Sequence, residues 1–164
     1  MNDVAEMTEA AMRVTRRAEP DDLAPLLELY LHLNPETPTL EHARANEIWT
    51  DMLSRKGVTV FVSMVEAKIV STCILATVPN LMRGGRPHAV IENAVTHSEY
   101  RRQGHGRATI GAALKAAWEQ DCHHVMLLTG RANLSVLSFY ESCGFERDIK
   151  IGFIARRTDG KVLN

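Results

Sequence analysis

One loop constrains the fold of this chain more than any other feature: the segment 99–109, which reads Glu-Tyr-Arg-Arg-Gln-Gly-His-Gly-Arg-Ala-Thr. A strand-like apolar run, 89–95, precedes it, and a strongly amphipathic helix is predicted to begin within it. Glycine lets the backbone come close to an anion, and the first N–H groups of a helix have no carbonyl partner. Arg101, Arg102 and Arg107 add positive charge. A strand, a glycine loop and a helix N-terminus in this order predict a pyrophosphate-binding site.

The spacing of the two glycines indicates the kind of cofactor. A dinucleotide-binding loop needs a third glycine, which the segment Gly104–Thr109 lacks, and the chain has no Gly-Lys-Ser/Thr loop for a nucleoside triphosphate. The spacing Arg101-x-x-Gly104-x-Gly106 instead resembles the Gln/Arg-x-x-Gly-x-Gly/Ala signature of the GNAT superfamily of acyl-CoA-dependent N-acetyltransferases. This chain has Arg102 where a glycine often follows the arginine in that family.

A second motif further along the chain resembles the same family. Asn133 or Ser135 is predicted to cap a short helix, a Phe-Tyr pair at 139–140 lies on it, and Gly144 is predicted to end it. Taken alone, such an aromatic pair is most simply two core residues. In the GNAT pattern an Asn begins this helix, the Phe-Tyr pair lies on it and Gly-Phe starts the next strand. The two motifs together extend the resemblance over about residues 13–156.

The resemblance implies an α/β (α+β) chain with the GNAT fold, a mixed, mostly antiparallel sheet of six to seven strands flanked by helices on both faces. We expect a single domain over residues 13–164, after an N-terminal extension at residues 1–12. In the resembled fold, the strands that end near Val95 and near Leu128 splay apart, and the acyl-CoA chain enters the gap between them.

Local patterns predict where the elements lie. Helices are predicted from Asp21 or Asp22, from a cap at Thr39, and over a segment whose apolar side includes Ile110 and Trp118. The apolar run 125–128 is typical of a strand buried on both faces. Strands are predicted at 13–17, 58–65, 68–78, 89–96 and 125–128, with one or two more at 145–147 and 149–156.

The composition excludes several classes of function. The chain has 164 residues and a net charge of −1, so no overall positive field would collect nucleic acid. Its apolar runs are far shorter than the ~20 residues that cross a bilayer. Three cysteines, Cys73, Cys122 and Cys143, are an odd number without metal-ligand spacing. They predict reduced thiols in a cytoplasmic protein that holds no metal.

The resemblance also implies which residues bind acetyl-CoA. The backbone of Val95, Thr96 and His97 would pair with the pantetheine arm, and one of their N–H groups would face the thioester oxygen. Asn133 matches a position that commonly contacts the pantetheine amides. The pyrophosphate would meet the backbone N–H groups from Gln103 through Ala108, with Arg102 and a Thr109 hydroxyl beside them; this loop comprises Gln103, Gly104, His105, Gly106, Arg107 and Ala108.

Two side chains are candidates for the proton transfers that acetylation of an amine requires. Tyr140 matches the family residue that protonates the departing CoA thiolate, and its alternative role is a core tyrosine. Glu92 is the candidate general base, because a carboxylate within a strand is rare unless it is paired or functional. Partial burial would raise the pKa of Glu92; alternatively, it faces solvent or binds the substrate ammonium group. His97 is a second candidate base.

The function that follows is an N-acetyltransferase that moves an acetyl group from acetyl-CoA to a primary amine by direct transfer in a ternary complex. A small-molecule amine is expected, since no long acidic or aromatic groove for a protein substrate is evident. Tyr30, His32 and Asn34 lie where the family docks its acceptor. The alternatives are a catalytically silent acyl-CoA-binding or regulatory module and a protein N-acetyltransferase. The resemblance also allows a homodimer.

Overall fold

The computed structural model describes residues 13–130 and 133–156. It divides into two compact units, Met1–Leu127 and Leu128–Asn164, which are described one after the other. The expected N-terminal extension at residues 1–12 lies outside the described residues.

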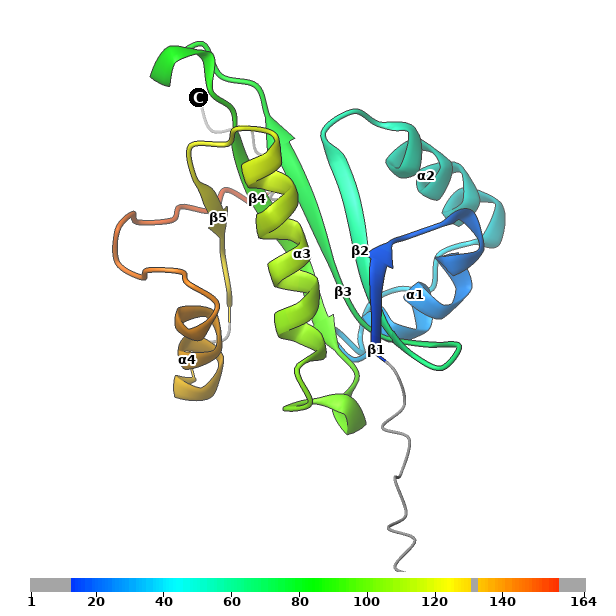
Figure 1. Ribbon diagram of the computed structural model, residues 1–164. Coiled ribbons are helices and arrows are strands. Elements are labelled where there is room, and N and C mark those ends of the chain that lie inside the picture. The colour runs from blue at the N-terminus through cyan, green and yellow to red at the C-terminus, as the bar shows by residue number, and fades with distance from the viewer. Residues whose placement is uncertain (1–12, 131–132, 157–164) are drawn as a thin grey trace, which may run out of the picture. The chain divides into compact units, whose positions relative to one another are not determined.

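The first unit is built on a five-stranded sheet in which the strands follow one another in chain order (Figure 1). The first four strands pair antiparallel, and the fifth pairs parallel with the fourth. The expected mixed, mostly antiparallel sheet is therefore confirmed. The strands are β1 (Arg13–Arg17), β2 (Val58–Val65), β3 (Lys68–Val78), β4 (His88–Thr96) and β5 (Val125–Leu127).

The strands expected at 145–147 and 149–156 are not formed, so the described sheet has five strands rather than six or seven. Residues 145–156 have no helix or strand, although Ile149, Ile151 and Phe153 alternate as they would in a strand. A strand needs the N–H and C=O groups of a neighbouring edge, and the alternation of side chains does not specify that partner. The prediction of these strands was therefore wrong.

The hairpin of β2 and β3 forms the middle of the sheet and lies where the sequence predicts it. Its strands are joined at Glu66 and Ala67, and Glu66 takes a left-handed backbone with φ of 54°. Successive side chains of β2 alternate between the two faces, so that Val62 enters a core of helix residues while Ser63 faces the opposite side. Both faces of this hairpin are buried, which explains its nearly continuous apolar sequence.

One face of the sheet is covered by α1 (Leu23–Tyr30) and α2 (His42–Ser54). Leu26 and Leu29 of α1 are buried against the strands, which contributes about 1.5–3 kcal/mol for each side chain. Trp49 of α2 joins the same core, and its indole N–H donates to the carbonyl of Pro20 at 2.9 Å. The helix begins after Glu41, whose carboxylate accepts from the Ala43 N–H, so the cap predicted at Thr39 was wrong.

The opposite face is covered by α3 (His105–Glu119), which packs on β2, β3 and β4 (Figure 1). Small side chains on its buried side, Ala113 and Ala117 among them, let the helix approach the strands closely. Ile110 is buried as predicted, but Trp118 is 52% exposed. The helical repeat predicts which side of the helix is apolar. It does not predict that the close approach of α3 to the sheet leaves room for alanine but not for tryptophan.

The second unit contains α4 (Leu134–Ser142) and the irregular segment after it. Asn133 caps this helix, because its Oδ1 accepts from the Val136 N–H at 3.0 Å. Gly144 follows the helix with φ of +94°, a conformation that favours glycine, so the predicted helix end is confirmed. None of the helices among residues 13–130 and 133–156 is long and apolar enough to cross a membrane.

Candidate functional site

The fourth strand is interrupted by a bulge. On β3, Cys73 alone stands opposite two residues of β4, Asn93 and Ala94, because Thr72 pairs with Val95 and Ile74 with Glu92. Asn93 takes φ of +50°, the left-handed conformation in which asparagine is less strained than most residues. The bulge was not predicted from the sequence, and the asparagine within a strand was its one local signal. A bulge of this kind bends the strand that carries it, here β4.

One edge of β4 is free beyond the bulge. The fifth strand pairs with β4 only at Ala89, Val90 and Ile91, and β5 ends at Leu127. Among the described strands, none pairs with this edge from Glu92 onwards. The end of the ladder at Ile91 is compatible with the expected divergence of the two strands. Backbone groups at such an edge are available to an extended ligand.

The directions of the backbone N–H groups decide which residue faces the free edge. His97 donates its N–H to the carbonyl of Val70 on β3 at 2.8 Å, so it is already used within the sheet. Because successive residues of a strand direct their N–H groups to opposite edges, the N–H of Thr96 points to the free edge. The carbonyl of Thr96 accepts from Nε of Arg101 at 3.2 Å, which fits the same direction. Of the three predicted positions, Thr96 is therefore the one whose backbone N–H faces the free edge.

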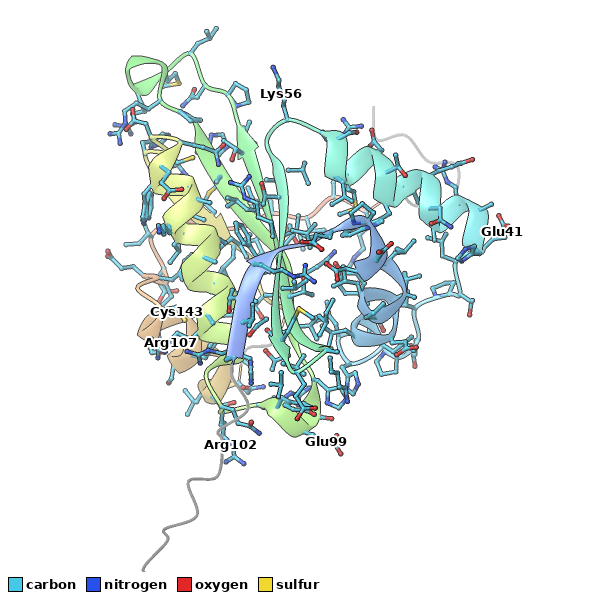
Figure 2. The ribbon with its side chains drawn as sticks, turned by 45° about the vertical axis from the view of Figure 1, so that its right-hand side comes forward. Glu41, Lys56, Glu99, Arg102, Arg107 and Cys143 are labelled. Atoms are coloured by element: carbon cyan, nitrogen blue, oxygen red, sulfur yellow. The ribbon has the colours of Figure 1, made fainter. Side chains whose placement is uncertain are left out.

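The free edge leads directly into the loop before α3. Gly104 takes φ of +87° at the start of the helix, and the first helical hydrogen bond runs from the Ala108 N–H to the Gly104 carbonyl at 3.0 Å. The N–H groups of His105 and Gly106 therefore precede the helical ladder, as an anion site requires. Figure 2 shows Arg102 and Arg107 beside this end of the helix.

Arg102 itself takes φ of +61°. The left-handed conformation is strained for arginine and unstrained for glycine, which is the residue the GNAT signature often has at this position. Arg102 is exposed, so its side chain extends from the loop toward solvent. Arg102 thus has a backbone conformation that suits the glycine of the signature. It is strained there, and it adds one positive charge to the loop.

Two polar side chains fasten the loop to the sheet. His105 is 4% exposed, and its Nδ1 lies 2.9 Å from Oγ of Ser63 on β2. Burial lowers the pKa of His105, and the charge of Arg13 lowers it further, so the ring is neutral near pH 7. Thr109 is 1% exposed; its hydroxyl donates to the Gly106 carbonyl at 3.0 Å and lies 3.4 Å from Oγ of Ser71 on β3. The expectation that this hydroxyl meets a phosphate was therefore wrong, because it faces the sheet.

Arg13 reaches the same loop from β1, and sequence reasoning did not single it out. A Cβ on Gly104 would lie 2.5 Å from Nη1 of Arg13, so the guanidinium lies against the glycine. No local pattern could have revealed this contact, because it depends on the pairing of β1 at the edge of the sheet.

Glu92 lies on the sheet face that carries α1 and α2. It pairs directly with Ile74, which packs against the core on that face, and paired residues of neighbouring strands share a face. Glu92 is exposed there, so the partial burial expected for it is not observed. The carboxylate is accessible to a solute on the α1–α2 side and precedes the bulge by one residue.

A cleft of about 560 Å³ opens on the α1 side, between α1, the β2–β3 turn and the end of β4. The rings of His32 and His97 meet there with their centroids 4.1 Å apart. Burial lowers the pKa of His97, and the charges of His32 and Lys68 lower it further. The cleft is lined by Pro25, Glu28, Leu29, His32, Glu66, Ala67, Lys68, Ile69 and His97.

Of the three residues predicted to bind the acceptor amine, Tyr30 and Asn34 do not line this cleft. Tyr30 packs against the core of α1, α2 and the sheet, where burial raises the pKa of its phenol to about 12, with a smaller contribution from Cys73. Its hydroxyl is therefore neutral at all physiological pH values. Asn34 is exposed and its Oδ1 accepts from the Glu36 N–H at 3.3 Å, so it shapes the loop after α1.

The remaining predicted residues lie in the second unit. Asn133 uses Oδ1 to cap α4 and to accept from the Ser135 hydroxyl, which leaves its amide NH₂ for other partners. Tyr140 is half-buried between the rings of Phe139 and Phe145, at centroid distances of 5.1 and 6.1 Å. Within the described residues, no group of three or more His, Cys, Asp or Glu side chains is arranged to hold a metal ion.

Comparisons with known proteins agree with this geometry. Residues 25–145 match the model of the acetyltransferase (GNAT) family. A glucosamine 6-phosphate N-acetyltransferase of Trypanosoma brucei brucei is 33% identical over 88% of this chain and 99% of its own length. The solved structure of a putative acetyltransferase from Agrobacterium tumefaciens str. C58 is 45% identical, with a TM-score of 0.84 over 88% of this chain and 99% of that chain.

A more distant structure shares the fold alone. It is an aminoglycoside N-acetyltransferase in complex with CoA, 16% identical, with a TM-score of 0.76 over 92% of this chain and 99% of that chain. The family model covers most of the chain, and the trypanosomal relative matches nearly its whole length. The divergent strands, the anion loop and these matches lead to one conclusion: the chain belongs to the GNAT family of acetyltransferases.

Proposed function

We propose that this protein transfers an acetyl group from acetyl-CoA to the primary amine of a small molecule, by direct attack in a ternary complex. One observation carries the proposal: the free edge of β4, beyond Ile91, is followed in the chain by the loop 97–104 and then by the N-terminal end of α3. The edge suits an extended pantetheine arm and the helix end suits a pyrophosphate. Family membership supplies the acetyl donor, and the CoA complex of the distant structure is consistent with it.

The backbone of the first unit would position the thioester. The N–H of Thr96 would donate to the thioester carbonyl or to a pantetheine amide, and the N–H groups of Gln103 through Arg107 would surround the pyrophosphate. Fixed backbone dipoles stabilise the oxyanion of the tetrahedral intermediate because they need no reorganisation during the reaction. Asn133 would add its free NH₂ group to the pantetheine amides.

The reaction exchanges one bond for another. The amine nitrogen attacks the thioester carbon, a C–N bond forms, and the C–S bond of acetyl-CoA breaks. Glu92, directly or through a water molecule, would take the proton that the amine loses, since its carboxylate is accessible on the acceptor side of the sheet. Tyr140 would give its phenolic proton to the CoA thiolate and recover one from water.

The acceptor would enter on the α1–α2 side. In the cleft beside His32 and His97, the ammonium group of Lys68 offers positive charge for an anionic group on the acceptor, while Glu92 offers a carboxylate for its ammonium group. The trypanosomal relative is named for an amino sugar phosphate, a substrate with both groups. Glucosamine 6-phosphate is accordingly the first acceptor to test, before aminoglycosides, polyamines, amino acids and peptides.

The test is the release of free CoA thiol from acetyl-CoA by the purified protein in the presence of each amine, with the acetylated product identified by mass. We expect one class of small amines to give release well above the hydrolysis blank. Release with a peptide N-terminus and with no small amine would overturn the small-molecule assignment. Binding of acetyl-CoA without release for any amine would favour a silent acyl-CoA-binding module.

Two variants test the catalytic roles. Tyr140→Phe and Glu92→Gln should each lower kcat by about 10²-fold, the size typical of lost general acid or base catalysis, with little change in KM for acetyl-CoA. Glu119→Gln, at the exposed end of α3, is the matched control and should behave as wild type. A kcat for either site variant within about twofold of wild type contradicts that residue's role.

A further inference from the structure

Arg13 occupies an unusual position for the first residue of an edge strand. Its backbone pairs with Val65 of β2, and its side chain is exposed. The guanidinium extends across the end of the sheet to the loop before α3, where Nη1 lies against Gly104. The first residue of β1 thus places a positive charge against the loop that the GNAT signature assigns to pyrophosphate.

No carboxylate within the described residues neutralises this charge, and no hydrogen bond fixes the guanidinium there. Its neighbour on the sheet side, His105, is buried and its pKa is lowered, in part by Arg13 itself. The neutral ring therefore adds neither a counter-charge nor a competing cation. An arginine without a counter-charge is suited to bind an anion, because the guanidinium is always charged and presents several N–H donors.

The charges of the loop itself increase the imbalance. Residues 98–109 contain Arg101, Arg102 and Arg107 but a single carboxylate, Glu99. The carboxylate of Glu99 is 4.0 Å from Nδ1 of His97, and Figure 2 shows it beside Arg102 at this end of the molecule. The positive charges of Arg13, Arg101 and Arg102 around one short loop repel one another in the free protein. A ligand with several negative charges would remove that repulsion.

We propose that Arg13 is a further phosphate-binding residue of the acyl-CoA site, donating from its guanidinium to the pyrophosphate of CoA. The inference rests on the proposed function, and it adds a ligand from the first strand to the loop and helix that the family signature describes. The pyrophosphate is favoured over the 3′-phosphate because the contact of Arg13 is with Gly104, at the start of the anion loop. Arginine matches phosphate oxygens with two parallel N–H donors.

The experiment compares the affinities of three ligands, measured by calorimetry, for wild type and Arg13→Gln. CoA, dephospho-CoA (without the 3′-phosphate) and pantetheine (without any phosphate) are the probes. We expect Arg13→Gln to weaken CoA and dephospho-CoA by about tenfold each, as for one lost charge-assisted hydrogen bond, and to leave pantetheine unchanged. Arg13→Lys, which keeps the charge and loses the paired donors, should fall between the two.

Arg17→Gln is the matched control, because Arg17 is exposed at the other end of the same strand. It should bind all three ligands within about twofold of wild type, and both variants should unfold at the wild-type temperature, since neither side chain is buried. A further sign of a phosphate contact is a shallower dependence of CoA affinity on salt for Arg13→Gln than for wild type.

Each other outcome overturns the inference. Equal CoA affinity for Arg13→Gln and wild type would exclude a phosphate contact, and a loss that disappears with dephospho-CoA would move the contact to the 3′-phosphate. Equal weakening of all three ligands would show a structural effect on the loop. Wild-type protein that binds none of the three ligands would contradict the proposed function itself, which distinguishes that failure from a failure of Arg13 alone.

Discussion

At the scale of single residues, the anion loop depends on backbone conformations that most side chains avoid. Arg102 and Gly104 of the loop have positive φ, and so does Asn93 in the bulge of β4 that precedes the loop. Strain of this kind is retained where the surrounding structure needs it, and here it directs backbone N–H groups toward one place. Glycine at 104 meets two demands together, since its φ is positive and the Arg13 guanidinium leaves no room for a Cβ.

We therefore predict that Gly104→Ala raises KM for acetyl-CoA by at least about tenfold and lowers the free energy of unfolding by about 1–2 kcal/mol. The left-handed conformation costs alanine roughly that energy, and the new methyl group would displace Arg13. Steady-state kinetics and urea unfolding measure the two effects.

The matched control is Gly111→Ala, in the middle of α3, where an added Cβ would meet no atom within 4 Å. It should stabilise the protein by about 0.5–1 kcal/mol, since alanine is the better helix former, and leave KM unchanged. If Gly104→Ala and Gly111→Ala behaved alike, the loop would not require a left-handed residue at 104.

At the scale of elements, one ion pair joins the edge strand to the first helix. Arg16 of β1 donates to both carboxylate oxygens of Asp22, at 2.6 and 2.9 Å, and Asp22 also accepts from the Glu19 N–H at 2.7 Å. Asp22 is buried, so the pair lies in a less polar medium than a surface pair. The Arg16 hydrogen bond is the main cause that holds the pKa of Asp22 below its usual value.

We predict that Asp22→Asn lowers the free energy of unfolding by about 2 kcal/mol, because it leaves the half-buried Arg16 without its counter-charge. Asp51→Asn is the control: it breaks an exposed pair with Arg55 within α2 and should cost less than about 0.5 kcal/mol. Urea unfolding of both variants at pH 7 gives the comparison. Equal losses would mean that burial does not distinguish the two pairs.

At the scale of the whole molecule, three groups link stability to pH. The pKa values of His97 and His105 are lowered, mainly by burial, so at acid pH the unfolded chain binds protons that the folded protein does not. Their contribution is complete above about pH 6.5 and is lost as the pH falls toward the folded-state values. The contribution of Asp22 is complete above about pH 3.9 and is lost as the pH falls through its lowered pKa.

We predict that the free energy of unfolding is nearly constant from pH 8 to about 6.5 and then falls on acidification. Urea unfolding in steps from pH 8 to 4.5 measures this decline. His105→Gln should make it shallower, whereas His42→Gln, at an exposed position of α2, should not change its slope. A stability that rises between pH 6.5 and 5 would contradict the neutral, buried state of His105.

The sequence predicts those parts of the fold that local chemistry decides. The bounds of β1, β2 and β3 follow from short runs of β-forming residues and a two-residue turn, and Gly144 ends α4 because only glycine is unstrained there. The family assignment depends on motifs of this local kind, namely the glycine loop and the Phe-Tyr helix. Both motifs can be recognised in the sequence without knowing which residues pack against them in the folded protein.

Apart from the cap at Thr39, the predictions that were wrong depended on a neighbour in space. Ile110 and Trp118 both belong to the apolar side predicted for α3, and the packing of the helix on the sheet decides that Ile110 is buried and Trp118 exposed. The Thr109 hydroxyl could reach a phosphate or the sheet, and the packing of α3 places it 3.4 Å from Oγ of Ser71 on β3. The segment 145–156 alternates like a strand but has no paired edge.

By itself, then, the sequence determined the family, the order of the elements in the first unit and the place of the loop proposed to bind a phosphate, because turn conformations, side-chain periods and N-terminal helix dipoles act within a few residues. Only the tertiary structure decided that the β4 edge is free beyond Ile91, that Thr96 rather than His97 faces it, and that Arg13 reaches Gly104. Those three features depend on how the strands pair and where the pairing stops, and no local pattern encodes the partner of a strand.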